Sequence, residues 1–455
     1  MAECGASPPS SLDCSSDASA KSDPGEKPLG LGSTQPSGAS SMKRRGLWNK
    51  RFIGLVLTQF AGATNDNILK SALLLAVAGG GTWSGSMGPG GTGYVNLLLT
   101  VPFVLLLGWA GQMADRWPKD RIIILTRLFE IPIGVLALFG FLLDDPWIVL
   151  TAFALLASES AFFSPAKYGC IPEIVDEDRV NEANGFVNMT TNIAILLGIG
   201  GGGVLLQIHP YWVGVAIPTL AIFGLLSSLL LRGLSPVAPE LPWKWNPFGP
   251  YLTAIRLIRP GLVWKSLLAW GWFYAAAIVV LAVIPEYRPY LHLDPAWASY
   301  LLAAVGLGIG IGCLVAGRIS GDRIRGGFVA LGGLGTGLVF CLLGILKPTD
   351  LSFWELWCCL LLAGMAAGFF LIPLQAIQQL CTPASDRARV LATANAMSFL
   401  LMSIASGLYS VVVPAFDVSP TRATFACGIL LLIVSGWVRF GSGRTILAAK
   451  APRSS

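Results

Sequence analysis

The feature that most constrains this chain is a series of apolar stretches, each about twenty residues long. A stretch of this length crosses the hydrocarbon part of a bilayer as an α-helix. The sequence contains twelve, at approximately 52–78, 93–114, 122–143, 147–168, 184–206, 211–231, 263–284, 297–317, 327–346, 354–374, 391–413 and 423–440. With 54% hydrophobic and 12% charged residues, the chain has more apolar surface than a soluble domain can cover. We therefore expect an all-α polytopic membrane protein with twelve transmembrane helices.

The distribution of Lys and Arg residues predicts how these helices are oriented. If the amino end lies inside, 25 cations fall in inner loops or at inner span ends. The outer loops then hold three cations, Arg288, Lys347 and Arg422. Cytoplasmic loops of membrane proteins carry such an excess of positive charge. We expect a protein of the cytoplasmic (inner) membrane with both termini in the cytoplasm.

The first 42 residues differ from the rest of the chain. They are rich in Ser, Pro and Gly, and they contain no apolar run. Such a segment cannot bury enough surface to offset the entropy of ordering, so residues 1–42 are predicted to be a disordered cytoplasmic tail. The nine Cys and two His residues lack metal-ligand spacing. The sequence indicates no metal, no cofactor and no nucleic-acid partner.

Several marks recur at a nearly constant offset. "GQMADRWPKDR" follows the second span and "GRISGDRIRGG" follows the eighth, which places Asp115 and Asp322 207 residues apart. Phe163 and Phe370 are also 207 residues apart. This repetition predicts two six-helix halves, 43–231 and 263–440, joined by a cytoplasmic linker at 232–262 and followed by a tail at 441–455. Two parallel halves around a central site are typical of transporters.

Six motifs in and beside these spans stand out: "NDNILK", "GQMADRWPKDR", "FFSPAKYGCIPEI", "VNEANGFVNMTTNIAILLG", "PLQAIQQL" and "RARVLATANAMSF". They resemble motifs of the major facilitator superfamily, and within it of the lysophospholipid transporter branch. The resemblance covers nearly all of residues 50–440. The form of "NDNILK" is closer to the version often fused to an acyltransferase and an acyl-carrier synthetase, domains that we do not expect in this protein.

This resemblance implies movement of lysophospholipids, such as lysophosphatidylethanolamine, from the outer to the inner leaflet for reacylation. A separate acyltransferase would be a partner, beside the substrate and membrane lipids, and we expect a monomer. The chain also lacks the HxxxxD pattern of acyltransferases, so we do not expect an enzyme. Stand-alone members of the branch tend to carry an arginine in span 7, where this sequence reads "WGWFYAAAIVVLAVIP".

Polar residues of the first span lie on one helical stripe. Gln59, Gly62, Asp66 and Lys70 follow the spacing i, i+3, i+7, i+11. Asp66 and Lys70 are spaced to form an i,i+4 ion pair, which limits the cost of burying each charge. One interpretation is a purely structural pair. The other is a cavity-facing pair that meets a zwitterionic head group, with Asp66 toward the ammonium and Lys70 toward the phosphate.

Further polar residues are candidates for the same site. Span 5 carries a second stripe that serves either helix packing or substrate contact. Glu159 in span 4 needs a partner, which we expect to be Lys70 or a proton. Arg127 and Glu130 in span 3 are spaced as a structural pair near the inner surface. The full set of predicted substrate-binding residues is Asp66, Lys70, Asn65, Asn67, Gln59, Glu159, Asn184, Asn188 and Asn192.

The loop after span 2 is predicted to act as a gate. An aspartate at this place accepts hydrogen bonds from the amino end of a helix in the other half, while flanking cations pair with acids there. Such contacts form in one conformation and break in the other. The predicted gating residues are Asp115, Arg116, Lys119, Arg121, Lys167 and Asp322.

Two functions fit these patterns. The first is a lysophospholipid transporter that works by alternating access. The second is a proton- or sodium-coupled exporter of amphipathic small molecules, with Asp66 and Glu159 as coupling sites.

Overall fold

The structure is a computed structural model that describes residues 47–176, 180–236, 239–240, 243–259, 261–320, 324–382 and 387–448. Within these ranges the chain is helical and forms no β-strand. The predicted tail at 1–42 and the end of the predicted tail at 441–455 lie outside the described residues. The prediction of an all-α fold is confirmed.

Twelve helices of the described chain have 19 residues or more. Their bounds are α1 Lys50–Val77, α3 Gly91–Arg116, α4 Lys119–Leu142, α5 Pro146–Ile174, α6 Val180–Ile208, α7 Pro210–Ser228, α9 Leu262–Val283, α11 Pro295–Ser320, α12 Gly327–Ile345, α13 Phe353–Leu380, α14 Arg387–Phe416 and α15 Pro420–Phe440. Eleven are long and apolar enough to cross a membrane. The twelfth, α1, is less apolar because the polar residues of "NDNILK" lie in its middle.

Shorter helices connect the long ones. They are α2 Ser84–Met87, α8 Gly249–Ile258, α10 Arg288–Leu291 and the 3₁₀ turns Leu229–Leu231, Ile284–Tyr287, Pro348–Asp350 and Ser442–Ile446. Local sequence sets several helix starts. Asn49 accepts hydrogen bonds from the backbone N–H groups of Arg51 and Phe52 at the start of α1, and Ser352 forms a capping box with Glu355 at the start of α13.

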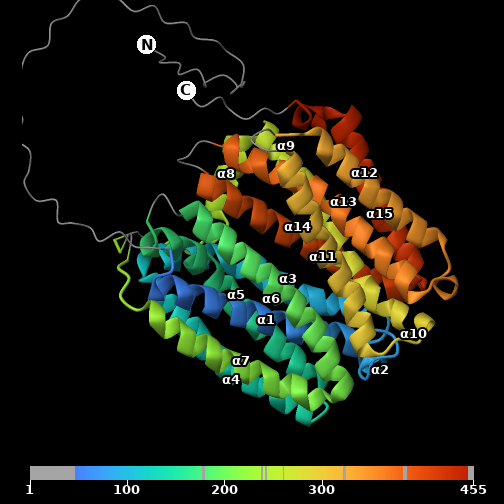
Figure 1. Cartoon of the computed structure of the whole chain (residues 1–455), viewed down its shortest axis with the longest axis horizontal. Coiled ribbons are helices and arrows are strands. Elements are labelled where there is room, and N and C mark those ends of the chain that lie inside the picture. The colour runs from blue at the N-terminus through green and yellow to red at the C-terminus, as the bar shows by residue number, and fades with distance from the viewer. Residues whose placement is uncertain are drawn as a thin grey trace, which may run out of the picture.

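The long helices pack as two groups with the same pairing pattern. In the first group α1 packs on α6 and α7, α3 on α5, and α4 on α5 and α7. In the second group α9 packs on α14 and α15, α11 on α13, and α12 on α13 and α15. Figure 1 shows the two groups side by side, with blue-to-green helices in one and yellow-to-red helices in the other. The repeated pairing is the structural counterpart of the repeated sequence marks.

Glycine allows some of these helices to approach closely. A Cβ atom on Gly308 of α11 would lie 2.2 Å from the carbonyl oxygen of Leu361 in α13. Gly312 of α11 and Gly364 and Gly368 of α13 are just as close to the facing backbone. Any larger residue would push α11 and α13 apart.

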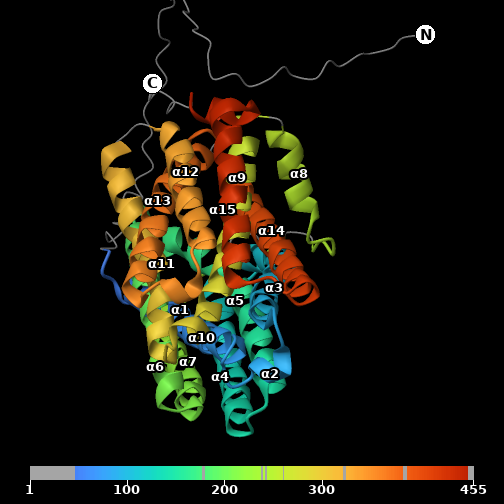
Figure 2. The same ribbon diagram turned by 90° about the vertical axis from the view of Figure 1, so that its right-hand side faces the viewer.

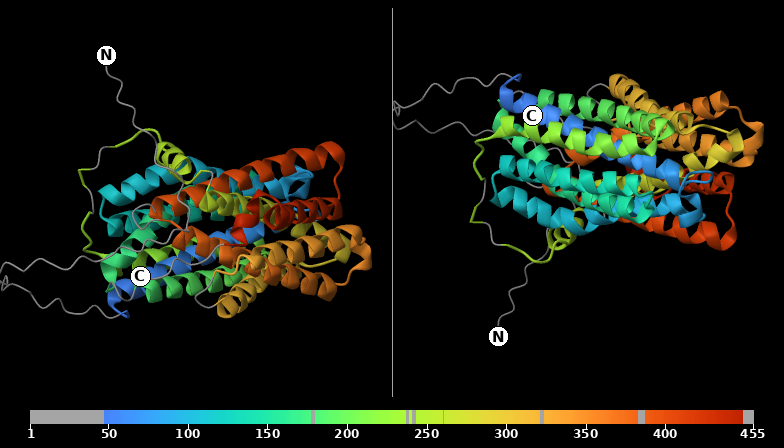
Figure 3. Two further views of the ribbon diagram at one scale, coloured as in Figure 1. Left: turned by 90° about the horizontal axis from the view of Figure 1, so that it is seen from above. Right: turned by 90° about the horizontal axis from the view of Figure 1, so that it is seen from below.

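The two groups meet through α3 with α14 and through α6 with α11. Hydrogen bonds join them near the end where α2 and α10 lie close to one another (Figures 1 and 2). Here Glu286 Oε2 accepts a hydrogen bond from Gly79 N (2.8 Å), and Arg288 Nη1 donates to Leu75 O (3.4 Å). Nearer the middle, Ser403 Oγ donates to Thr100 Oγ1 (2.8 Å). The linker between α7 and α9 lies at the opposite end of the bundle (Figure 3).

Candidate functional site

A buried arginine joins three helices of the first group. Arg127 of α4 is only 1% exposed and pairs with Glu130 one turn further along α4. Arg127 Nη2 also lies 3.0 Å from Glu159 Oε1 of α5. Asn65 Nδ2 of α1 donates a hydrogen bond to Glu130 Oε1 (2.5 Å). We call these four residues the Arg127 cluster.

The surroundings of Arg127 fit its guanidinium closely. Its carbon Cζ lies 4.3 Å from the centre of the Phe163 ring, a favourable cation–π contact. A Cβ atom on Gly62 of α1 would lie 2.3 Å from Arg127 Nη1, so glycine at this position makes room for the cation. One Arg between two carboxylates, with Asn65 as a further donor, limits the desolvation cost of burying these charges.

The Arg127 cluster revises two sequence predictions. The pairing of Arg127 with Glu130 is confirmed, but the pair is buried between helices and shared with α1 and α5, so it is more than a local pair. The expected partner of Glu159 was Lys70 or a proton, and its partner in the structure is Arg127. The sequence did not indicate this, because the two residues are 32 positions apart on different helices.

Asp66 lies next to the Arg127 cluster but outside its ion pairs. Its Oδ2 accepts a hydrogen bond from Ser160 Oγ of α5 (2.9 Å), and its Oδ1 is buried without a hydrogen-bond partner. The possible i,i+4 ion pair between Asp66 and Lys70 is not formed within 4 Å. The physical reason is that the Asp66 carboxylate is directed toward α5, where it accepts the hydrogen bond from Ser160.

Two lysines near this site also lack a carboxylate partner. In the part of the chain that the structure describes, neither Lys70 nor Lys167 takes part in an ion pair. Lys70 is half-buried. Lys167 is buried, and its Nζ lies 4.3 Å from the centre of the Tyr168 ring and 5.8 Å from that of Phe163. Lys167 therefore lies among the aromatic residues of α5, and its role in the gate stays a prediction.

The predicted substrate-binding asparagines of span 5 lie on α6. Asn188 and Asn192 are exposed. Asn188 Oδ1 accepts a hydrogen bond from Tyr168 OH (3.3 Å), and Asn192 Nδ2 donates to the backbone oxygen of Asn188 (3.0 Å). The side chain of Asn184 lies outside the described residues. The α6 stripe thus contacts α5 on the face that carries Tyr168.

The remaining predicted residues of α1 have helix partners. Gln59 Nε2 donates to Thr191 Oγ1 of α6 (3.1 Å), which is the helix-packing role. Asn67 Nδ2 donates to the Ala63 carbonyl oxygen within α1 (2.8 Å). Asp66 and Lys70 are the two charged side chains of the predicted stripe, and neither forms an ion pair with the described residues.

The predicted gate makes contacts within the first group and with the linker. Asp115 is exposed, as is Arg121. Lys119 Nζ lies 2.5 Å from Glu173 Oε1 at the end of α5, and Arg116 lies 6.0 Å from the Trp243 ring of the linker. Asp322 lies outside the described residues. In this conformation the described contacts of these residues do not join the two helical groups, so their role as a gate stays a prediction.

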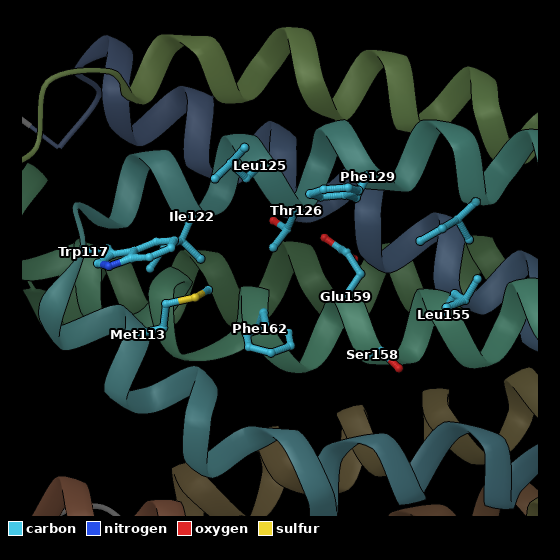
Figure 4. Close-up of a pocket in the computed structure, with 11 residues that line it drawn as sticks. Met113, Trp117, Ile122, Leu125, Thr126, Phe129, Leu155, Ser158, Glu159 and Phe162 are labelled. Carbon is cyan, nitrogen blue, oxygen red and sulfur yellow. The ribbon is translucent and has the colours of Figure 1, made fainter. Parts of the chain in front are cut away.

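An apolar pocket of about 410 Å³ lies between the end of α3 and the helices α4 and α5. Figure 4 shows Thr126 of α4 and Glu159 of α5 pointing toward one another in it, among apolar side chains. Leu125, Phe129 and Leu155 of its wall are exposed on the surface of the bundle. The pocket therefore joins the outer surface of the first group to the Arg127 cluster through Glu159. Among the residues that the structure describes, no group of His, Cys, Asp and Glu side chains is arranged to hold a metal ion.

The described chain has eleven apolar helices long enough to cross a membrane, and its helices form two groups with equivalent pairing. One group holds a polar site in its interior. These features define a membrane transporter of the two-fold pseudosymmetric class. The sequence profile of the Major Facilitator Superfamily matches residues 53–407. The chain belongs to this superfamily.

Similar proteins agree with this assignment. The chain is 28% identical over 403 residues to the lysophospholipid transporter LplT of Enterobacter sp. (strain 638), with 86% of this chain and 96% of that protein covered. It is 27% identical over 418 residues to LplT of Photorhabdus laumondii, covering 84% and 94% of the two chains. The resemblance to the lysophospholipid transporter branch is confirmed.

Solved structures show the same fold at low sequence identity. A transporter of the POT family in complex with a thioalcohol-conjugated peptide is similar with a TM-score of 0.70 and 11% identity, covering 88% of this chain and 98% of that one. A bacterial homolog of the human lysosomal transporter Spinster, in an inward-facing and unoccupied conformation, is similar with a TM-score of 0.61 and 15% identity. It covers 90% of this chain and 99% of that one.

Proposed function

We propose that this protein transports lysophospholipids across the cytoplasmic membrane, from the outer to the inner leaflet, by alternating access. The relatives that match most of the chain are named lysophospholipid transporters. The observation that carries the proposal is the state of Asp66 and Lys70. They lie one turn apart on α1, have opposite charges, and neither forms an ion pair with the described residues.

Such an arrangement suits a zwitterionic head group. Asp66 Oδ1 lacks a hydrogen-bond donor, and an ammonium group supplies one. Lys70 lacks an anion, and a phosphate supplies that. Each contact is a charge-assisted hydrogen bond, which is stronger than a neutral one. Ser160, which donates to Asp66 Oδ2, orients this carboxylate for the substrate.

The proposed direction rests on charge placement. The positive-inside asymmetry supports a cytoplasmic position for the linker end of the bundle and an outer position for the end with α2 and α10. The hydrogen bonds of Glu286 and Arg288 would then join the two groups on the outer side. Alternating access requires that they break when the site opens outward.

We also propose an oligomeric state and partners for this protein. The protein acts as a monomer, contacts membrane lipids, and delivers lysophospholipid to a separate acyltransferase on the inner side. It catalyses no acylation itself. The family match, which is to a superfamily of transporters, supports a role without covalent chemistry.

A binding measurement with the purified protein tests the proposed head-group contacts. We expect Asp66→Asn to weaken binding of lysophosphatidylethanolamine by about 10- to 100-fold, the effect of losing one charge-assisted hydrogen bond. The same substitution should reduce the affinity for a lysophospholipid without an amine much less. The exposed Asp350→Asn is the control and should bind both lipids as the wild type does. Equal losses for both lipids would argue against a contact between Asp66 and the ammonium group.

The second function is a proton- or sodium-coupled exporter of amphipathic small molecules. Two carboxylates of the first group favour it: Glu159 is buried, and Asp66 has a buried Oδ1 atom without a hydrogen-bond partner. Ion flux into proteoliposomes that depends on an added amphiphile, without translocation of lysophospholipid, would favour this second function.

A further inference from the structure

The linker between α7 and α9 is attached to the side of α3 by its backbone. Trp109 Nε1 donates a hydrogen bond to Trp245 O (3.0 Å), and Gln112 Nε2 donates to Lys244 O (3.0 Å). In return, Lys244 N donates to Gln112 Oε1 (2.8 Å). A Cβ atom on Gly108 would lie 2.2 Å from Pro247 O, so the close approach requires glycine at this point. These contacts hold the linker at the last turns of α3.

The aromatic side chains of this segment are exposed. Trp245 is 81% exposed and forms an edge contact with Trp243, with the ring centroids 6.3 Å apart. Phe248 is exposed as well. An ordered backbone that presents large apolar rings outward, next to a membrane-spanning helix, is unusual for a loop surrounded by water. Trp and Tyr are enriched at the level of lipid head groups.

Helix α8 continues this surface with positive charge. Its Tyr251, Ile255 and Ile258 are half-buried, and α8 packs on α14. Leu252, Arg256 and Arg259 follow the spacing i, i+4, i+7 and are exposed. Arg259 also stacks on the Trp264 ring at 4.6 Å.

The charge balance of the linker is one-sided. Residues 232–262 contain the cations Arg232, Lys244, Arg256 and Arg259, and their one acid is Glu240. The surface formed by Lys244, Trp245, Arg256 and Arg259, together with Trp243, Phe248 and Leu252, is called the linker surface below. It combines exposed cations with exposed apolar side chains on two segments that are both fixed to transmembrane helices, α3 and α14.

We propose that the linker surface binds anionic phospholipid head groups of the adjacent leaflet. The guanidinium groups of Arg256 and Arg259 and the amine of Lys244 would contact phosphate, while Trp243 and Trp245 would lie at the head-group level. Because α3 and α14 belong to different helical groups and pack on one another, lipids bound here would contact both sides of one seam between the groups. This site differs from the proposed transport site, which lies inside the first group.

The test is titration of purified full-length protein with phosphatidylglycerol, followed by native mass spectrometry. We expect the wild type to bind phosphatidylglycerol in preference to phosphatidylcholine. The variant Lys244→Gln/Arg256→Gln/Arg259→Gln should weaken phosphatidylglycerol binding by tenfold or more. Because the attraction is electrostatic, the preference should also shrink as salt is raised.

Two controls keep the result interpretable. Lys347→Gln/Arg422→Gln removes exposed cations at the other end of the bundle and should leave phosphatidylglycerol binding unchanged. The charge-conserving variant Lys244→Arg/Arg256→Lys/Arg259→Lys should retain it. Equal binding of the two phospholipids by the wild type, or wild-type affinity in the Gln variant with its fold intact, would overturn the proposal. The outcome is independent of whether lysophospholipid is transported.

Discussion

At the scale of single residues, the Arg127 cluster depends on Gly62. A Cβ atom at this position would collide with Arg127 Nη1, at 2.3 Å. We expect Gly62→Ala to displace the guanidinium and to destabilise the protein by about 1–3 kcal/mol, the usual cost of overpacking. This loss of stability is measured as a fall in Tm in a fluorescence-detected thermal melt. The control is Gly310→Ala in α11, where an added Cβ has no neighbour within 4 Å, and its Tm should stay at the wild-type value.

Arg127 itself is expected to be essential for a different reason. Arg127→Leu would leave Glu130 and Glu159 buried without a cation, and breaking a buried ion pair in this way costs about 3–5 kcal/mol. We expect little folded protein in a size-exclusion profile. The triple variant Arg127→Leu/Glu130→Gln/Glu159→Gln removes the charges together and should recover folded protein. A folded, stable single variant would contradict the role assigned to this cation.

The side-chain contacts of these residues could be predicted from the sequence only in part. The spacing of Asp66 and Lys70 placed both on one stripe of α1, and Arg127 and Glu130 were correctly paired because they lie one turn apart on one helix. The contacts of Asp66 with Ser160 and of Arg127 with Glu159 join different helices. Helical periodicity says which residues share a face, but it does not say which neighbouring helix covers that face.

At the scale of helices, the end with α2 and α10 is held by the η3 segment Ile284–Tyr287. Glu286 accepts hydrogen bonds from Gly79 N (2.8 Å) and from Thr92 Oγ1 (3.5 Å) in the other group. We expect Glu286→Ala to weaken this contact and to raise the population of molecules opened at this end. Spin labels at Gly85 and Tyr290, in a variant without native cysteines, measure the separation by electron–electron double resonance.

The control for that experiment is Glu355→Ala. Glu355 belongs to the capping box at the start of α13 and makes its side-chain bonds to Ser352, not to the other helical group. Its distance distribution should match that of the wild type. If Glu286→Ala gave the same distribution as well, the contacts of Glu286 would not control this end.

The positions of the helices were largely predictable. A hydrocarbon core of fixed thickness demands about twenty apolar residues per crossing, and the observed helices begin and end within a few residues of most predicted spans. The attachment of the linker to α3 was not predictable. It depends on backbone atoms of Lys244 and Trp245 and on the missing side chain of Gly108, none of which leaves a periodic signal.

At the scale of the whole molecule, the two helical groups with equivalent pairing support transport through movement of one group against the other. The charged site lies in the first group, where α1, α4 and α5 meet. The second group contributes the contacts of α11 and α14 with the first group. The concentration of charge in the first group was not indicated by the repeated sequence marks.

The proposed transport of lysophospholipid, with Asp66 in contact with the substrate, is tested by a translocation assay. The initial rate at which proteoliposomes of purified protein move radiolabelled lysophosphatidylethanolamine between leaflets is measured. We expect a rate well above that of empty liposomes for the wild type and for Asp350→Asn, and a loss of about tenfold or more for a folded Asp66→Asn variant. A wild-type rate equal to that of empty liposomes, with the protein folded, would contradict the proposed function.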